Sequence, residues 1–222
     1  MDVTVILPVE AGPAPRRRGR PAQETAVSEE RMLDHVFSAF ASLGYEGTTV
    51  REIAKQLSVS HNLLNVRFGS KADLWKRAID WRVARFGGPV FTAFDELPDD
   101  PEARLRLLVH RFCAWAAANP DWVGITHAEG RRATWRLDYI VEIYIRPFKQ
   151  RLDALFAEVA ARRTMRSLST SAFMALLVEG AGFYFASRPL LDLIGEPDER
   201  DGRKVDDQVD RLANFLLGGL LG

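Results

Sequence analysis

The sequence predicts an all-α fold with an N-terminal helix-turn-helix three-helix domain and a larger C-terminal helical domain, about nine helices in all. Two observations support this. From residue 28 onward, apolar residues recur at helical spacing. Helix-start signals, a Ser, Thr, Asp or Asn before an acidic residue or proline, precede these stretches. We divide the chain into a basic arm (1–27), a helix-turn-helix domain (28–80) and a ligand-binding and dimerisation domain (81–222).

The arm shows no helical periodicity, because four prolines and two glycines interrupt it. The first predicted helix, 28–43, begins at the capping residue Ser28 and ends at Gly44. Met32, Leu33 and Val36 start its apolar face. Its predicted role is to brace the two helices that follow.

Residues 48–74 predict two short helices and the start of a third. Thr49, Ser60 and Ser70 are the expected N-caps, and Gly69 ends the second helix. A small residue, Ala54, lies five positions before Val59 in the turn, and the apolar Leu64 lies five positions after it. This spacing is typical of a helix-turn-helix, in which the second helix enters the DNA major groove. The alternative is a helical hairpin that is only structural.

Residues 48–77 hold six basic and two acidic residues in a chain with zero formal net charge. A local basic surface is the expected footprint of phosphate binding, although solvated lysines often have no role. Several positions together resemble the tetracycline-repressor (TetR) family of transcriptional regulators: Thr48–Ala54, Val59–Ser60, Leu64, Phe68, Ser70–Lys71 and Leu74. The chain departs from that family at Ser58, usually glycine, at Asn65, usually tyrosine, and at Leu63, usually small or polar.

The resemblance implies a transcriptional regulator, usually a repressor, that binds a palindromic double-stranded operator as a homodimer. We expect phosphate contacts at Tyr45, Thr48, Thr49, Arg51 and Lys71. The second helix, which Ser60 caps, is expected to contact base edges through His61, Asn62, Leu63 and Asn65. Arg67 could contact either a base or a phosphate. In the arm, Arg16–Pro21 resembles an AT-hook, so Arg18 and Arg20 are expected in the minor groove. The alternative for the arm is a solubilising tail.

Further helices are predicted over about 71–86, 101–118, 120–127, 131–161, 169–187 and 205–221. Asp100–Pro101 and Asn119–Pro120 are cap-proline starts. Pro147 predicts a kink or break inside the long helix. Gly180 and Gly182 predict a close helix crossing.

The middle of the chain is rich in aromatic residues, and core packing is the ordinary explanation for most of them. The sharper interpretation is a pocket for a small hydrophobic or aromatic effector. The candidate lining residues are Phe112, Trp115, Trp122, His127, Glu129, Trp135, Tyr139 and Phe173.

The last predicted helix, 205–221, carries an apolar stripe that calls for more cover than one domain edge supplies. In the resembled family, the last two helices pair with their twins in a dimer, and the alternative is burial within the protomer. The candidate interface residues are Phe173, Leu177, Gly180, Tyr184, Val209, Leu212, Leu216 and Leu220.

Composition limits the other possibilities. The single cysteine cannot form an internal disulfide and, with no signal peptide or membrane-length apolar run, favours a cytoplasmic location. No phosphate loop, nucleophile elbow or set of metal ligands appears, so we expect neither an enzyme nor a metal or other cofactor. The remaining alternative function is a helical ligand-binding or interaction protein.

Overall fold

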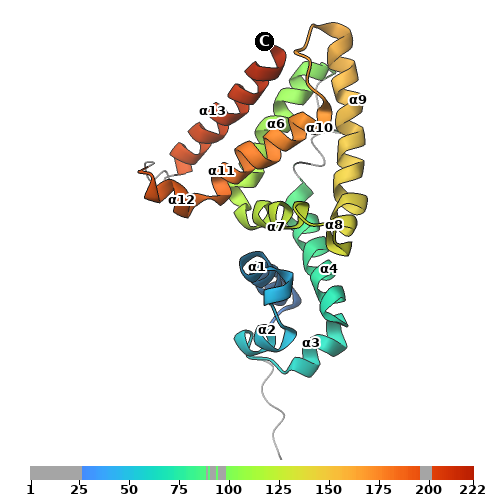
Figure 1. Cartoon of the computed structure of the whole chain (residues 1–222), viewed down its shortest axis with the longest axis vertical. Helices are drawn as coiled ribbons and strands as arrows, with labels where there is room; N and C mark the ends of the chain where they lie inside the picture. Colours follow the sequence, from blue (N-terminus) through green and yellow to red (C-terminus); the bar gives the residue numbers. More distant parts are fainter. Residues whose placement is uncertain (1–26, 89, 91–93, 95–98, 196–201) are drawn as a thin grey trace, which may run out of the picture.

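The computed structural model describes residues 27–88, 90, 94, 99–195 and 202–222, and all regular structure within these ranges is helical. The N-terminal helices form one end of an elongated molecule, and the C-terminal helices form the other (Figure 1). Arg18 and Arg20 lie outside the described residues. None of the described helices is long and apolar enough to cross a membrane.

The N-terminal bundle consists of α1 (Glu29–Gly47), α2 (Val50–Gln56), α3 (His61–Phe68) and α4 (Lys71–Arg82). Ser28 caps α1 as predicted, and Gly44 leaves the helical conformation at φ 71° near the end of that helix. The predicted caps Thr49, Ser60 and Ser70 each accept a backbone hydrogen bond three residues on. The bundle core also takes in Ile125 and Ile140 from the C-terminal part of the chain, so the two ends share packing.

Helix α4 continues without a break into the π-helical turn η2 (Val83–Gly87). The chain then forms α6 (Pro101–Ala118) and α7 (Pro120–Gly130), which begin at the two predicted cap-proline sites. Asp100 accepts a hydrogen bond from the Ala103 amide, whereas Asn119 makes no side-chain cap.

The predicted long helix is divided into α8 (Trp135–Ile140), the π-helical turn η3 (Val141–Ile145) and α9 (Arg146–Arg162). Pro147 sits in the first turn of α9, directly after η3. Proline cannot donate a hydrogen bond to the preceding turn, and its ring crowds the carbonyl there. The predicted distortion is therefore confirmed, and it takes the form of a widened turn rather than a break.

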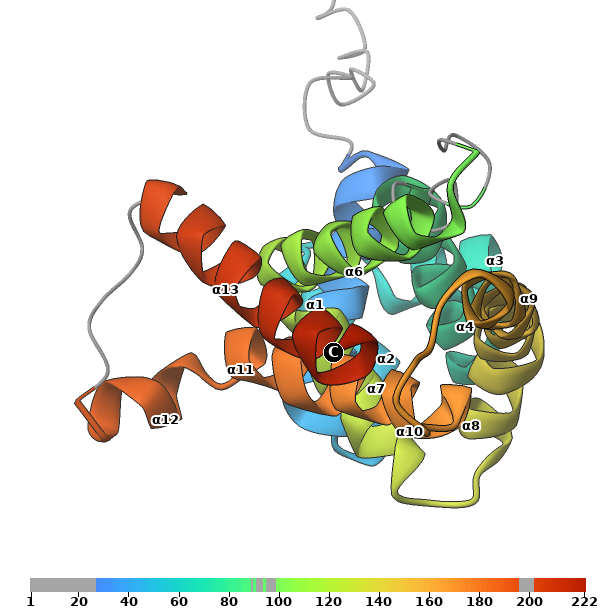
Figure 2. The same cartoon turned by 90° about the horizontal axis from the view of Figure 1, so that it is seen from above.

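The C-terminal part consists of α10 (Thr170–Ala175), the π-helical turn η4 (Leu176–Gly182), α11 (Phe183–Ala186), α12 (Arg188–Leu193) and α13 (Gly202–Leu221). Helix α13 packs along α6, and α12 projects away from the rest of the molecule (Figure 2). The sequence patterns did not predict α12.

Candidate DNA-binding surface and ligand cavity

The turn between α2 and α3 has the predicted helix-turn-helix geometry. Ala54 and Leu64 are buried, and the Val59 amide donates to the Ala54 carbonyl at 3.0 Å. Ser58, where the resembled family usually has glycine, adopts a left-handed φ of 56°. Short-range constraints therefore set the angle between α2 and α3.

Helix α3 buries only Leu64 and Phe68 and exposes the rest of its surface. The predicted base-contacting residues His61, Asn62, Leu63 and Asn65 are all exposed. The Asn65 side-chain nitrogen lies 3.2 Å from Nδ1 of His61, one turn away. Polar groups and one apolar side chain thus stand on an open helix face, as direct readout of base edges requires.

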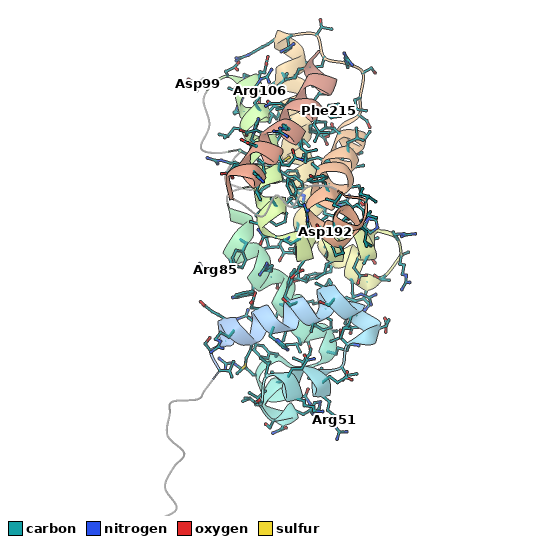
Figure 3. The ribbon with its side chains drawn as sticks, turned by 90° about the vertical axis from the view of Figure 1, so that its left-hand side faces the viewer. Arg51, Arg85, Asp99, Arg106, Asp192 and Phe215 are labelled. Atoms are coloured by element: carbon teal, nitrogen blue, oxygen red, sulfur yellow. The ribbon has the colours of Figure 1, made fainter. Side chains whose placement is uncertain are left out.

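Several predicted phosphate contacts surround this face. Thr49 and Arg51 are exposed at the start of α2, and Arg51 lies at the opposite end of the molecule from Phe215 (Figure 3). Ser60 is exposed, with its hydroxyl accepting from the Leu63 amide at 3.1 Å. Two hydrogen bonds from Ser70 hold the pKa of Asp73 below its ordinary value, so Asp73 stays ionised in the capping box beside Lys71.

Lys71 and Arg136 both lie close to the ring of Tyr45. Nζ of Lys71 lies 4.2 Å from the Tyr45 ring centroid, and Cζ of Arg136 lies 4.4 Å from the same centroid. Tyr45 is half-buried, and burial raises its pKa. Tyr45 thus connects a predicted phosphate contact with an arginine of the C-terminal part.

The structure removes Thr48 from the predicted contacts. Its side chain is buried, and its hydroxyl donates to the Gly44 carbonyl at 2.7 Å. The Thr48 side chain therefore closes the end of α1 and does not face solvent.

Arg67 is engaged within the protomer. Its Nη2 lies 2.7 Å from Oε2 of Glu29, and this hydrogen bond lowers the pKa of Glu29. The ion pair holds α3 against α1, and it uses Nε and Nη2 of Arg67.

An apolar cavity of about 120 Å³ lies where η2, α6, α7, η3, α9, α10 and η4 meet. Three of the eight predicted ligand-binding residues, Phe112, Trp115 and Trp122, line it. The other lining residues were not in the predicted set: Val83, Gly87, Val90, Val123, Thr126, Tyr144, Ile145, Phe148, Met174, Val178. The Trp115 indole nitrogen is buried without a hydrogen-bond partner among the described residues.

The remaining predicted ligand residues do not line this cavity. Trp135 packs edge-on against Trp75 and Tyr45, and Phe173 is buried against Phe156. Glu129 accepts from Arg136 at 2.7 Å, and His127 pairs with Glu179. Partners within the protomer account for these four side chains.

Tyr139 also lies outside the cavity and instead joins Tyr144 in a link to α4. Their hydroxyls donate to the same Asp80 oxygen, Oδ1, at 2.7 and 2.5 Å. Burial and the hydrogen bond to Asp80 raise the pKa of Tyr139 to about 12 and raise that of Tyr144 as well. Both hydroxyls therefore remain protonated donors at neutral pH.

The structure also corrects the predicted dimer residues. Phe173, Leu177, Val209 and Leu220 are buried in the protomer core, so they are not free to contact a second chain. Gly180 is exposed, and Tyr184, Leu212 and Leu216 are half-buried. Large exposed apolar side chains lie on η4, α11 and α13 and also at α12: Leu176, Phe183, Leu190, Leu193, Ile194, Phe215.

Comparison with known proteins identifies the N-terminal bundle. Residues 33–78, which span α2, α3 and most of α1 and α4, match the family model described as "Bacterial regulatory proteins, tetR family". The segment that matches is therefore similar to the DNA-binding part of TetR-family regulators. The match indicates DNA-binding transcriptional regulation as the class of function. A search of curated protein sequences gave no match.

Solved structures share the fold of this protein over most of its length. The ketosteroid transcriptional regulator KstR2 of Mycobacterium tuberculosis is 18% identical, with a TM-score of 0.69 over 89% of this chain and 97% of that one. The fatty acid degradation regulator FadR of Bacillus halodurans is 20% identical, with a TM-score of 0.62 over 87% and 100%. FadR of Bacillus subtilis, in complex with stearoyl-CoA, is 15% identical, with a TM-score of 0.61 over 85% and 97%. At these identities the likeness shows the fold alone.

Proposed function

We propose that this protein is a homodimeric repressor of the TetR type, which leaves a palindromic operator when a small hydrophobic or aromatic molecule occupies the apolar cavity. One observation carries the proposal. Tyr144 lines the cavity and donates to Asp80 on α4, the helix whose first residue is Lys71. A ligand that displaces Tyr144 therefore acts on the helix that begins beside the DNA-binding surface.

The energetic requirement is modest. A ligand that binds the DNA-free conformation a hundredfold more tightly than the DNA-bound one shifts the balance by about 2.7 kcal/mol. The cavity wall includes Val83 and Gly87 of η2, which continues α4, so a ligand contacts this helical segment directly. The regulators of similar fold named for ketosteroids and fatty acid degradation, and the one bound to stearoyl-CoA, support a largely apolar effector.

The proposed dimer uses the exposed apolar face at the end of the molecule remote from α3. Phe215 on α13 and Phe183 on α11 are 79% and 39% exposed. A Cβ added at Gly180, Gly218 or Gly219 would meet nothing within 4 Å in the protomer. Small residues beside exposed aromatic side chains suit close packing of helices from a second chain. The two α3 helices would then read operator half-sites about 34–36 Å apart.

The test measures binding to DNA that flanks the protein's own coding region, by fluorescence anisotropy at low and moderate salt. We expect affinity to fall steeply with salt, because phosphate contacts release counterions. Lys71→Ala should weaken binding to all sequences and reduce the salt slope by about one unit. Lys204→Ala, the same charge change on α13, is the matched control and should leave binding unaltered.

A thermal-shift screen of apolar metabolites then identifies molecules to add to the protein–DNA complex. Release of DNA by a compound that stabilises the protein supports the proposal, and a reporter placed behind the operator should be derepressed by it. Absence of any DNA shift at every salt concentration would favour the alternative, a ligand-binding protein with a structural helical hairpin. Activation of the reporter by the unliganded protein would contradict repression.

A further inference from the structure

A second cavity lies beside the first. It has a volume of about 220 Å³ and opens between α7, α8, η3, α10 and η4. Four residues line both cavities: Thr126, Ile145, Met174, Val178. At these positions the two cavities are adjacent, and a wall one side chain thick separates them.

The dividing wall is apolar and adaptable. The Thr126 hydroxyl donates to the Trp122 and Val123 carbonyls of its own helix, at 3.2 and 3.1 Å, and needs no partner in either cavity. Met174 and Val178 are half-buried. Methionine is unbranched, and its three side-chain torsions let it change shape at low cost. Met174 is therefore the residue of the shared wall that can change shape most easily.

Size favours joint use of the two spaces. Pockets for drug-sized ligands hold roughly 300–1,000 Å³. The cavities of about 120 and 220 Å³ each fall below this range, but together they reach it. A ligand that fills both must be elongated, because it passes through the narrow region beside Met174.

Charge distinguishes the two ends of such a ligand. Among the described residues, the first cavity is lined by no charged side chain, whereas Glu129 and Glu179 line the second. Arg136 and Thr134 already satisfy Glu129, at 2.7 and 3.1 Å, and Glu179 pairs with His127. A carboxylate head group would meet two carboxylates with no described cation in the lining. An ammonium or hydroxyl group can instead donate to Glu179, which is exposed.

We propose that the two cavities form one divided binding site for a long-chain amphiphile with a hydrogen-bond-donating head group, an amine or alcohol rather than a carboxylate. The alkyl tail occupies the first cavity, and the head group lies beside Glu179 in the second. This inference rests on the proposed function, because it specifies the effector of the same regulator.

Chain length provides the first test. Isothermal titration calorimetry, below the aggregation limit of each probe, compares hexan-1-ol with decan-1-ol. Each buried methylene tightens binding about fourfold, so decan-1-ol should bind at least about 30-fold more tightly. Ala175 is exposed and lines only the second cavity, so Ala175→Phe should reduce that ratio below about 5 and leave hexan-1-ol unaffected. Ala154→Phe, on an exposed position of α9 that lines neither cavity, should keep the wild-type ratio.

Leu137→Trp fills the second cavity from α8 and provides an independent variant if Ala175→Phe misfolds. An unchanged ratio in the folded variants, or equal affinity of the wild type for both alcohols, overturns the divided site. If hexan-1-ol binds and releases the protein from DNA while decan-1-ol does not bind, the divided site is wrong and the proposed function still holds. If no alkyl probe binds, the inference fails, and the DNA-binding measurements above judge the proposed function separately.

The head group provides the second test. Decylamine should bind at least about tenfold more tightly than decanoate at neutral pH, because the carboxylates beside the head group favour a cation. Glu179→Gln should weaken decylamine and leave decan-1-ol within about twofold. Tighter binding of decanoate than of decylamine would overturn the head-group assignment.

Discussion

At the scale of single residues, the helix-turn-helix depends on a turn residue with an unfavourable backbone. Ser58 has φ 56°, and it is the only non-glycine residue with positive φ in the described part of the chain. A left-handed conformation costs a residue with a Cβ roughly 1–2 kcal/mol, and glycine escapes that cost. Leu57 directly before it is still helical, with φ −76° and ψ −5°, so the chain reverses at Ser58.

We therefore predict that Ser58→Gly raises the free energy of unfolding by about 0.5–1 kcal/mol. The relief of strain exceeds the larger conformational entropy that glycine gives the unfolded chain. Urea denaturation measures the change. Ser58→Ala keeps the Cβ and is the control, so an equal gain in that variant would show that φ is not the cause.

Some residue positions could be predicted from the sequence because the contacts are local. The caps at Thr49, Ser60 and Ser70 each depend on an amide three residues away. The role of Thr48 could not be read in this way, since its hydroxyl reaches the carbonyls of Gly44 and Ala39 in the preceding helix. The sequence around a threonine next to a helix cap does not reveal whether its side chain faces DNA or is buried inside the protein.

At the scale of helices, the sequence predicted the apolar faces but not what covers each of them. Phe112 and Phe173 both lie on such faces, yet Phe112 borders the cavity and Phe173 packs against Phe156. Whether space remains beside a side chain depends on residues far along the chain. In α13, Val209 and Leu220 are buried in the protomer, and Phe215 is left outside. The predicted apolar stripe of the last helix is therefore a real helix face, but its buried residues pack inside the protomer.

The two glycines of η4 separate a contact within the protomer from an open surface. A Cβ at Gly182 would lie 3.3 Å from both Val123 methyl groups, whereas one at Gly180 would meet nothing within 4 Å. Gly182→Leu should lower the free energy of unfolding by about 2 kcal/mol through overpacking against Val123.

Gly180→Leu is the matched variant and should leave protomer stability unchanged or raise it by up to about 1 kcal/mol through helix propensity. Urea denaturation at two protein concentrations separates folding from association. If Gly180→Leu destabilises the protein as much as Gly182→Leu at the lower concentration, close packing against Val123 is not the reason for the glycine at 182.

At the scale of the whole molecule, α4 runs from the N-terminal bundle toward the C-terminal helices (Figure 1). Its continuation η2 lines the cavity with Val83 and Gly87. Trp75 of α4 is buried and contacts Trp135 and Tyr139 edge-on, with ring centroids 5.3 and 6.1 Å away. Asp80, further along α4, receives the hydroxyls of Tyr139 and Tyr144. Of the two tyrosines, only Tyr144 borders the cavity among the described residues.

This asymmetry predicts that Tyr144→Phe uncouples ligand binding from DNA release. A hydrogen bond to a charged group contributes about 1.5–3 kcal/mol, so its loss should reduce the ligand-induced change in DNA affinity by about tenfold. The affinity of the ligand for DNA-free protein should change little, since the Tyr144 ring still lines the cavity. Anisotropy titrations with and without ligand give this coupling factor. Tyr139→Phe removes the other donor to Asp80 without touching the cavity and should keep most of the coupling. Equal losses in both variants would mean that the charge of Asp80, rather than contact through Tyr144, transmits the signal along α4.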